Sequence, residues 1–106
     1  MSKTLLFIVN PRAGKTRSAA PLFEAVTLLS EAGYLISIRQ TRERGQAARM
    51  VREEGGSFDR VVCCGGDGTL NETVAGAMAL DAPPPIGYIP CGSTNDFAAS
   101  LCLPDE

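Results

Sequence analysis

A regular alternation of short apolar runs with segments of helical spacing constrains the fold of this chain more than any other feature. The apolar runs are rich in β-favouring residues and predict four strands, at Leu5 to Val9, Tyr34 to Arg39, Arg60 to Cys64 and Ile86 to Ile89. The segments that follow them predict four helices, from about Ser18 to Ala32, Gln46 to Glu54, Thr69 to Leu80 and from near Ser93 to about Leu101. This alternation implies right-handed crossovers and helices on both faces of a parallel sheet. The predicted fold class is therefore α/β, a three-layer α-β-α sandwich with a mainly parallel sheet.

Apolar stripes predict which face of each helix is buried. The stripes consist of Leu22, Phe23, Val26 and Leu29 in the first helix, Ala47, Ala48 and Val51 in the second, and Leu70, Val74, Ala77 and Met78 in the third. Gly33 and the pair Gly55 and Gly56 are placed to end the first two helices.

The loops after the strands hold most of the unusual residues. These loops run from Asn10 to Lys15, Thr41 to Arg44, Gly65 to Gly68 and Pro90 to Thr94. Because the carboxyl ends of parallel strands share one edge of the sheet, where ligands bind, all four loops are expected there. Six of the ten basic residues cluster around two of these connections, as Arg12, Lys15, Arg17, Arg39, Arg42 and Arg44. They are either ordinary solvated charges or groups that offset phosphate charge.

The run from Gly65 to Glu72, GGDGTLNE, lies where a strand turns into a helix. Unpaired N–H groups and the positive end of the dipole attract anions at a helix N-terminus, and glycines let a ligand approach the backbone closely. Thr69 and Glu72 have the spacing of a capping box for this helix. The run therefore predicts a turn that receives phosphate.

Asp67 stands inside this turn. A carboxylate there repels phosphate unless a cation lies between them, so Asp67 suggests Mg²⁺ held through water, with an Asx-turn as the structural alternative. Ser93 and Asp96 repeat the pattern at the start of the last predicted helix. Asn10 could close a turn before Pro11, and Thr41 could cap the second helix.

Several other functions are disfavoured by the sequence. Val9 stands where a P-loop needs its first glycine, and Asn71 replaces the third glycine of a dinucleotide fingerprint. The net charge of −2 argues against a general nucleic-acid or membrane-surface binder. The chain has no histidine, which excludes Ser-His and Cys-His pairs. The four cysteines have neither zinc spacing nor a secreted pattern, and no run is long enough to cross a bilayer, so reduced thiols and the cytoplasm are expected.

Three segments together resemble the diacylglycerol kinase catalytic domain family, which includes bacterial lipid kinases and the sphingosine and ceramide kinases. They are Asn10 to Gly14, Gly65 to Glu72 and Pro90 to Ala98, and they follow the family's order over the whole chain. NAD kinases share the GGDGT run but not the P-x-G-T-x-N-D element, which Pro90 to Asp96 approximates. Two departures are Ser93, where threonine is usual, and Ser100, where an arginine is common.

The resemblance implies a nucleotide-binding domain like those of phosphofructokinases and NAD kinases. It implies transfer of the γ-phosphoryl group of ATP to the hydroxyl of diacylglycerol or a related lipid, with Mg²⁺. Asp67 is then a catalytic residue that binds the metal indirectly, through water. By position, the residues implied to contact ATP are Asn10, Pro11, Arg12, Ala13, Gly14, Thr41, Gly65, Gly66, Asp67, Gly68, Thr69, Leu70, Asn71, Glu72, Gly92, Ser93 and Thr94.

The family also has a second, β-rich domain that supplies the lipid groove, the catalytic base and part of the metal site. Residues 1–106 resemble only the N-terminal ATP-binding part, so the isolated chain is expected to bind nucleotide weakly without turnover. The parent protein is expected to associate transiently with membranes, and a homodimer is left open. The alternatives are a kinase of a soluble substrate such as NAD or a sugar phosphate, and a regulatory module that binds ATP without catalysis.

Overall fold

The computed structural model describes residues 3–10 and 20–90 of the chain. Its elements are β1 (Lys3–Val9), α1 (Ala20–Glu31), β2 (Tyr34–Gln40), α2 (Gln46–Glu54), the 3-10 helix η1 (Gly55–Ser57), β3 (Arg60–Gly65), α3 (Asp67–Met78) and β4 (Ile86–Pro90). Every strand predicted from the sequence is present, and so are the first three helices, with small shifts at their ends. The helix predicted from near Ser93 lies outside the described residues.

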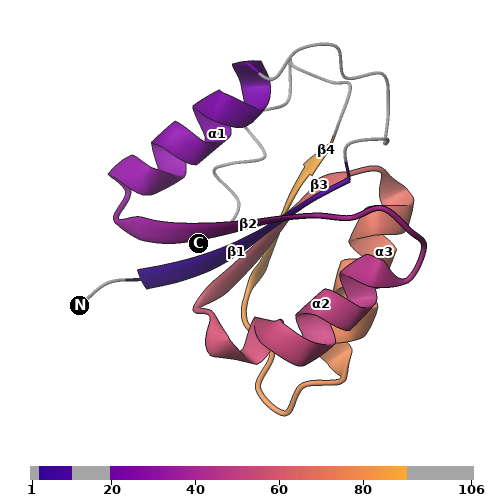
Figure 1. Cartoon of the computed structure of the whole chain (residues 1–106). Coiled ribbons are helices and arrows are strands. Elements are labelled where there is room, and N and C mark those ends of the chain that lie inside the picture. Colours follow the sequence, from indigo (N-terminus) through magenta and orange to yellow (C-terminus); the bar gives the residue numbers. More distant parts are fainter. Residues whose placement is uncertain (1–2, 11–19, 91–106) are drawn as a thin grey trace.

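The four strands form one sheet in the order β2-β1-β3-β4, and all neighbouring strands are parallel (Figure 1). Helix α1 covers one face of the sheet, and α2 and α3 cover the other. The three-layer α-β-α fold predicted from the alternation is therefore confirmed. Among residues 3–10 and 20–90, no helix has the length and apolar character of a membrane span.

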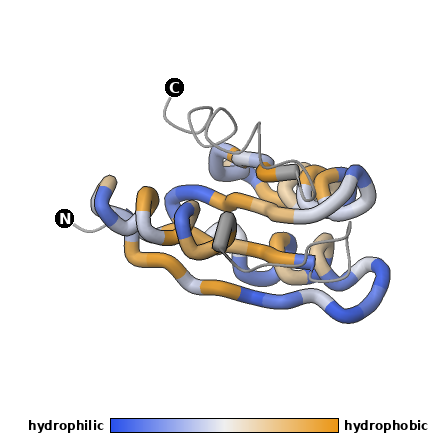
Figure 2. The backbone as a smooth tube through the Cα atoms, turned by 90° about the horizontal axis from the view of Figure 1, so that it is seen from above, coloured by the Kyte–Doolittle hydropathy of each residue, from blue (hydrophilic) through white to orange (hydrophobic). Residues whose placement is uncertain are grey.

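The central strand β1 contributes to the core on both sides of the sheet. Leu5, Phe7 and Val9 pack toward α1, whereas Leu6 and Ile8 pack toward α2 and α3. Burial of each such side chain contributes about 1.5–3 kcal/mol to folding, which explains why β1 is a continuous apolar run without polar alternation. Figure 2 shows hydrophobic segments along the middle of the molecule and hydrophilic colour concentrated at connections between elements.

The predicted stripe of α1 was only partly right. Leu29 is buried and Leu22 packs against the core, but Phe23 is 71% exposed. Ala25, which the stripe omitted, is fully buried. Leu22, Ala25 and Leu29 have the spacing of a single helix face. Phe23 follows Leu22 directly, so its side chain lies about 100° around the helix from that face.

The predicted stripe of α3 was also wrong at two positions. Met78 is 76% exposed and Val74 is 41% exposed, while the buried residues of this helix are Thr69, Thr73, Gly76 and Ala77. The reason is close helix packing, since a Cβ on Gly76 would overlap the carbonyl oxygen of Ala48 in α2. This contact depends on small residues, and a prediction based on large apolar side chains does not identify such a face.

Two of the cysteines, Cys63 and Cys64, lie in β3, and both are buried, as expected. Cys63 is fully buried and its thiol donates to the carbonyl of Gly87 at 3.6 Å. Burial raises the pKa of the Cys63 thiol from 9.0 to about 11, and a hydrogen bond with Thr73 only partly opposes this effect. The other two cysteines, Cys91 and Cys102, lie outside the described residues.

The raised pKa of Cys63 predicts a loss of stability at alkaline pH. Between pH 9 and 11 the unfolded thiol ionises while the folded one keeps its proton, so rising pH favours the unfolded state. We expect the free energy of unfolding to fall by about 2–3 kcal/mol more over this window than in Cys63→Ala, as measured by urea unfolding. Equal losses in the two proteins would contradict the prediction.

Candidate functional site

The carboxyl ends of three strands meet the first turn of α3 at one pocket. The pocket has a volume of about 450 Å³ and is lined by Asn10, Thr41, Arg42, Glu43, Arg44, Gly68, Thr69 and Glu72. Asn10 follows β1, Thr41 follows β2 and Gly68 follows β3. The expected meeting of these three post-strand loops at one edge is therefore confirmed.

Asn10 connects β1 with β3 and α3. Its backbone N–H donates to the carbonyl of Cys64 at 2.9 Å, and its side-chain amide donates to the hydroxyl of Thr69 at 3.3 Å. These contacts fix Asn10, which lines the pocket, against the end of β3 and the first turn of α3. Its role is thus more than closing a turn before the next residue.

Thr41 is fixed at the end of β2 and is only 5% exposed. Its N–H donates to the carbonyl of Val9 at 2.9 Å, and its hydroxyl donates to the same oxygen at 3.5 Å. The alternative role as the cap of α2 is wrong, because Gly45 is the N-cap residue of that helix.

The glycine turn forms the N-terminus of α3. Gly66 is the extended N-cap residue, and the first helical hydrogen bond runs from the N–H of Leu70 to the carbonyl of Gly66 at 3.2 Å. The N–H groups of residues 66–69 therefore have no partner within the helix. A Cβ on Gly66 or Gly68 would meet nothing within 4 Å, so a ligand has room beside this backbone. This geometry suits an anion.

Gly65 is needed for a different reason. A Cβ at this position would lie 2.5 Å from the hydroxyl oxygen of Thr69. The carbonyl of Gly65 also accepts a hydrogen bond from the hydroxyl of Tyr88 in β4 at 3.1 Å. The turn is therefore held closely against the sheet.

The capping box predicted for Thr69 and Glu72 is wrong. The helix begins at Asp67, so Thr69 is already inside its first turn, and its hydroxyl accepts from Asn10. Glu72 instead reaches across to α2, where its carboxylate accepts from the N–H groups of Gly45 at 2.8 Å and Ala47 at 3.2 Å. Sequence reasoning missed this link because it joins two helices that are distant in the chain.

Asp67 is exposed at the start of α3, beside the pocket but not in its lining. Within residues 3–10 and 20–90, no group of three metal-ligating side chains is present. Of the other residues of the glycine run, Leu70 packs against the core between the sheet and α2, and Asn71 is exposed. Neither lines the pocket.

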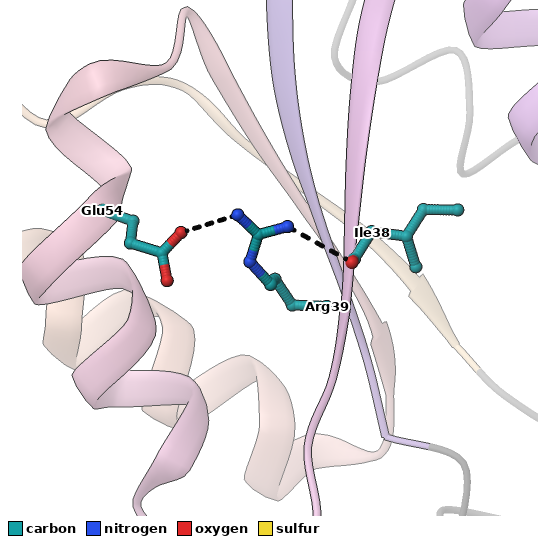
Figure 3. A network of polar contacts seen from close by, with 3 residues as sticks. All are labelled: Ile38, Arg39 and Glu54. Atoms are coloured by element: carbon teal, nitrogen blue, oxygen red, sulfur yellow. Dashed lines mark hydrogen bonds and ion pairs between the residues drawn. The ribbon is translucent and has the colours of Figure 1, made fainter.

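The basic cluster around β2 divides into two parts. Arg42 and Arg44 line the pocket. Arg39 does not, because it lies within β2 and pairs with Glu54 of α2 at 3.0 Å (Figure 3). Its guanidinium also donates to the backbone carbonyl of Ile38 at 3.4 Å. Grouping Arg39 with the loop charges was therefore incorrect, since its head group is used to hold α2 against the sheet edge.

The remaining residues predicted for the site lie outside the described residues. They are Pro11, Arg12, Ala13, Gly14, Lys15 and Arg17 after β1, and Gly92, Ser93 and Thr94 after β4.

Comparison with known proteins gives a consistent result. The profile of the diacylglycerol kinase catalytic domain matches residues 4–106. The chain is 43% identical to a probable lipid kinase YegS-like of Chromohalobacter salexigens, over 88% of this chain and 31% of the relative. It is 38% identical to a diacylglycerol kinase of Bacillus subtilis, over 98% of this chain and 35% of the relative. The chain thus spans about a third of the length of these curated relatives.

A solved structure agrees with the sequence matches. The crystal structure of a diacylglycerol kinase from Bacillus anthracis superimposes with a TM-score of 0.83 at 28% identity. The match covers 97% of this chain and 43% of that one.

Proposed function

This chain belongs to the diacylglycerol kinase catalytic domain family, and from that premise we propose that it is the ATP-binding part of a lipid kinase. The parent enzyme transfers the γ-phosphoryl group of ATP to the hydroxyl of diacylglycerol or a related lipid. The observation that carries the proposal is the N-terminus of α3, where backbone N–H groups and the open positions at Gly66 and Gly68 adjoin a pocket of about 450 Å³. Catalysis of this kind depends chiefly on positioning and charge stabilisation.

The charges around the pocket support a phosphate-bearing ligand. The dipole of α3 directs its positive end to the glycine turn, and Arg42 and Arg44 add two guanidinium groups in the pocket lining. In the proposed arrangement the phosphates lie against Gly66 to Gly68, and the rest of the nucleotide lies between this turn and the loop after β2.

The described residues fit a magnesium ion that arrives with the nucleotide. Mg²⁺ keeps several waters and is commonly bound by one or two carboxylates together with substrate phosphates. Asp67 is an exposed carboxylate beside the phosphate turn, whereas both oxygens of Glu72 already accept backbone N–H groups. Glu43 is a second exposed carboxylate, but it lies in the loop after β2 and not at the phosphate turn. Asp67 is therefore the group that we propose would hold the ion through water, and the ion would neutralise phosphate charge.

The catalytic base and the lipid groove are proposed to lie in a part of the parent protein beyond residues 1–106. This division follows the family resemblance and agrees with the coverage of about a third of the relatives. Access to a lipid acceptor would bring the cytoplasmic parent protein transiently to a membrane surface.

The proposal predicts where labelled phosphate goes. Full-length protein with γ-labelled ATP and Mg²⁺ is expected to label a species in a lipid extract, and to leave NAD and fructose 6-phosphate unlabelled. Residues 1–106 alone are expected to bind ATP weakly and to label nothing, because the acceptor site is elsewhere.

Three other results would change the conclusion. Label in NAD or the sugar phosphate indicates a kinase of a soluble substrate. ATP binding by the full-length protein without transfer to any acceptor indicates a regulatory module. Lipid phosphorylation by residues 1–106 alone contradicts the proposed division of the site.

A further inference from the structure

We propose that Glu72 is a positioning residue of the nucleotide pocket, which fixes the loop from Thr41 to Gly45 against α3 without touching the nucleotide. The inference rests on the proposed function, and it replaces the role in ATP contact that the family resemblance implied for this residue. It follows from three observations: the partners of the carboxylate, the composition of the pocket walls, and the conformation of the loop.

Both carboxylate oxygens of Glu72 are occupied by backbone donors. Oε2 accepts from the N–H of Gly45 at 2.8 Å, and Oε1 accepts from the N–H of Ala47 at 3.2 Å. These donors belong to the N-terminus of α2, where N–H groups have no partner within the helix and a negative charge is favourable. Glu72 thus caps a neighbouring helix, from a position on α3 one turn beyond Thr69.

Glu72 lines the pocket, and its partner Gly45 directly follows the lining residues 42–44 in the loop after β2. The loop after β2 supplies Thr41 and residues 42–44, and α3 supplies Gly68 and Thr69. A carboxylate on α3 with no hydrogen-bond donors would repel a phosphate placed at the N-terminus of this helix. Because both oxygens of Glu72 accept hydrogen bonds from the N-terminus of α2, that repulsion is reduced and the residue can hold the loop after β2 against α3.

The loop is held to β1 at its start by Thr41 and to α3 at its end by Glu72. The side-chain oxygen of Gln46 accepts from the N–H groups of Arg42 at 2.6 Å and Glu43 at 3.3 Å, which sets the local shape of the turn. Gly45 has a φ of 82°, the left-handed region that favours glycine, and its N–H is directed to Glu72. Arg42, Glu43 and Arg44 are all exposed, so core packing does not fix this part of the loop. The hydrogen bond from Gly45 to Glu72 therefore sets its position relative to α3.

The variant Glu72→Gln tests this role with the smallest change of shape. A glutamine has one acceptor oxygen, so one of the two N–H groups would face another donor. In the full-length protein we expect the KM for ATP, and the dissociation constant of ATP, to rise about tenfold or more, since charge-assisted hydrogen bonds are lost. The kcat at saturating ATP should change less than about threefold, because bound nucleotide restores the loop.

Glu54→Gln is the matched control. It also removes a carboxylate contact that holds α2, the ion pair with Arg39, but away from the pocket lining. Both variants are expected to lower the melting temperature slightly, and only Glu72→Gln should raise the KM for ATP. If the two variants lose stability equally and both keep the wild-type KM, Glu72 is structural only and the inference fails.

Hydrogen exchange on nucleotide-free protein separates positioning from direct contact. The amides of Gly45 and Ala47 should be protected in the wild type and exchange faster in Glu72→Gln. Weaker ATP binding with unchanged exchange at these amides would mean that Glu72 contacts the nucleotide, which overturns the inference.

Gly45→Ala tests the same contact by changing the residue of the loop that donates to Glu72. Its Cβ would enter open space, so the added strain comes only from the positive φ, and a rise in the KM for ATP of about fivefold is expected. Combined with Glu72→Gln, its effect should be less than additive. Additive effects contradict a shared mechanism. A wild-type protein that binds no ATP at all would instead refute the proposed function, and the inference with it.

Discussion

Asp67→Ala should lower the kcat for lipid phosphorylation by the full-length protein by about a thousandfold, while the fold stays intact. Asp67 is exposed at the first turn of α3, so its removal costs the fold only its interaction with the helix dipole, about 0.3–1 kcal/mol. The loss of activity has a different origin. In the proposed arrangement Asp67 holds the magnesium ion through water, so its removal would leave the phosphate charge less neutralised.

Two further variants make this result specific. Asp67→Asn keeps the ability to form an Asx-turn but loses the charge, so it should be almost as inactive as the alanine variant. Asp81→Ala removes an exposed aspartate after α3, away from the pocket lining, and should keep wild-type activity. Circular dichroism melts should be nearly the same for all three. If Asp67→Asn were active, Asp67 would serve to form the turn, and the proposed role in metal binding would be wrong.

Gly76→Ala should destabilise the protein by about 2–3 kcal/mol, the cost of overpacking a close contact. An alanine in a helix interior is normally favourable by about 0.5–1 kcal/mol relative to glycine. Here the new Cβ would overlap the carbonyl oxygen of Ala48 and lie 2.9 Å from the Cβ of Val51. Both belong to α2, and a backbone carbonyl cannot rotate away as a side chain can, so the two helices must separate.

Urea unfolding measures this effect, with Gly56→Ala as the control. A Cβ on Gly56 would meet only a side-chain carbon of Leu80 at 3.8 Å, an ordinary contact, so stability should change by no more than about 0.5 kcal/mol. Because the contact between Glu72 and the N-terminus of α2 lies beside the pocket, separation of α2 from α3 by Gly76→Ala should weaken ATP binding. Unchanged stability would show that α2 moves freely against α3.

The two central strands, β1 and β3, were predictable because their burial is nearly complete. Leu5 to Val9 are buried on both faces of the sheet, so almost every position has to be apolar and the run is visible in the sequence. The shared edge of the post-strand loops follows from parallel topology alone. The pocket could therefore be located before any side chain was placed.

The helix contacts and the internal links of the site could not be predicted in the same way. The face of α3 toward α2 includes Gly76, which has no side chain, and Ala77, whose side chain is small, so this face carries little hydrophobic signal in the sequence. The spacing of Thr69 and Glu72 fits a capping box within α3, but it is equally compatible with contacts to other elements. The capping-box prediction did not consider that Glu72 could bind the N–H groups at the start of α2. Arg39 looked like a loop charge because its partner, Glu54, is distant in sequence but adjacent across the sheet edge.

The strand order β2-β1-β3-β4 has a consequence for how the pocket can evolve. The chain leaves β1 toward β2 on one side and leaves β3 toward β4 on the other, so the connections after these two adjacent strands diverge. The opening between them is a topological switch point, and it exists whatever residues the loops contain. Asn10 and Thr69 join its two sides. Loop substitutions can therefore alter which ligand is accepted while the opening itself persists, as long as the order of the strands is kept.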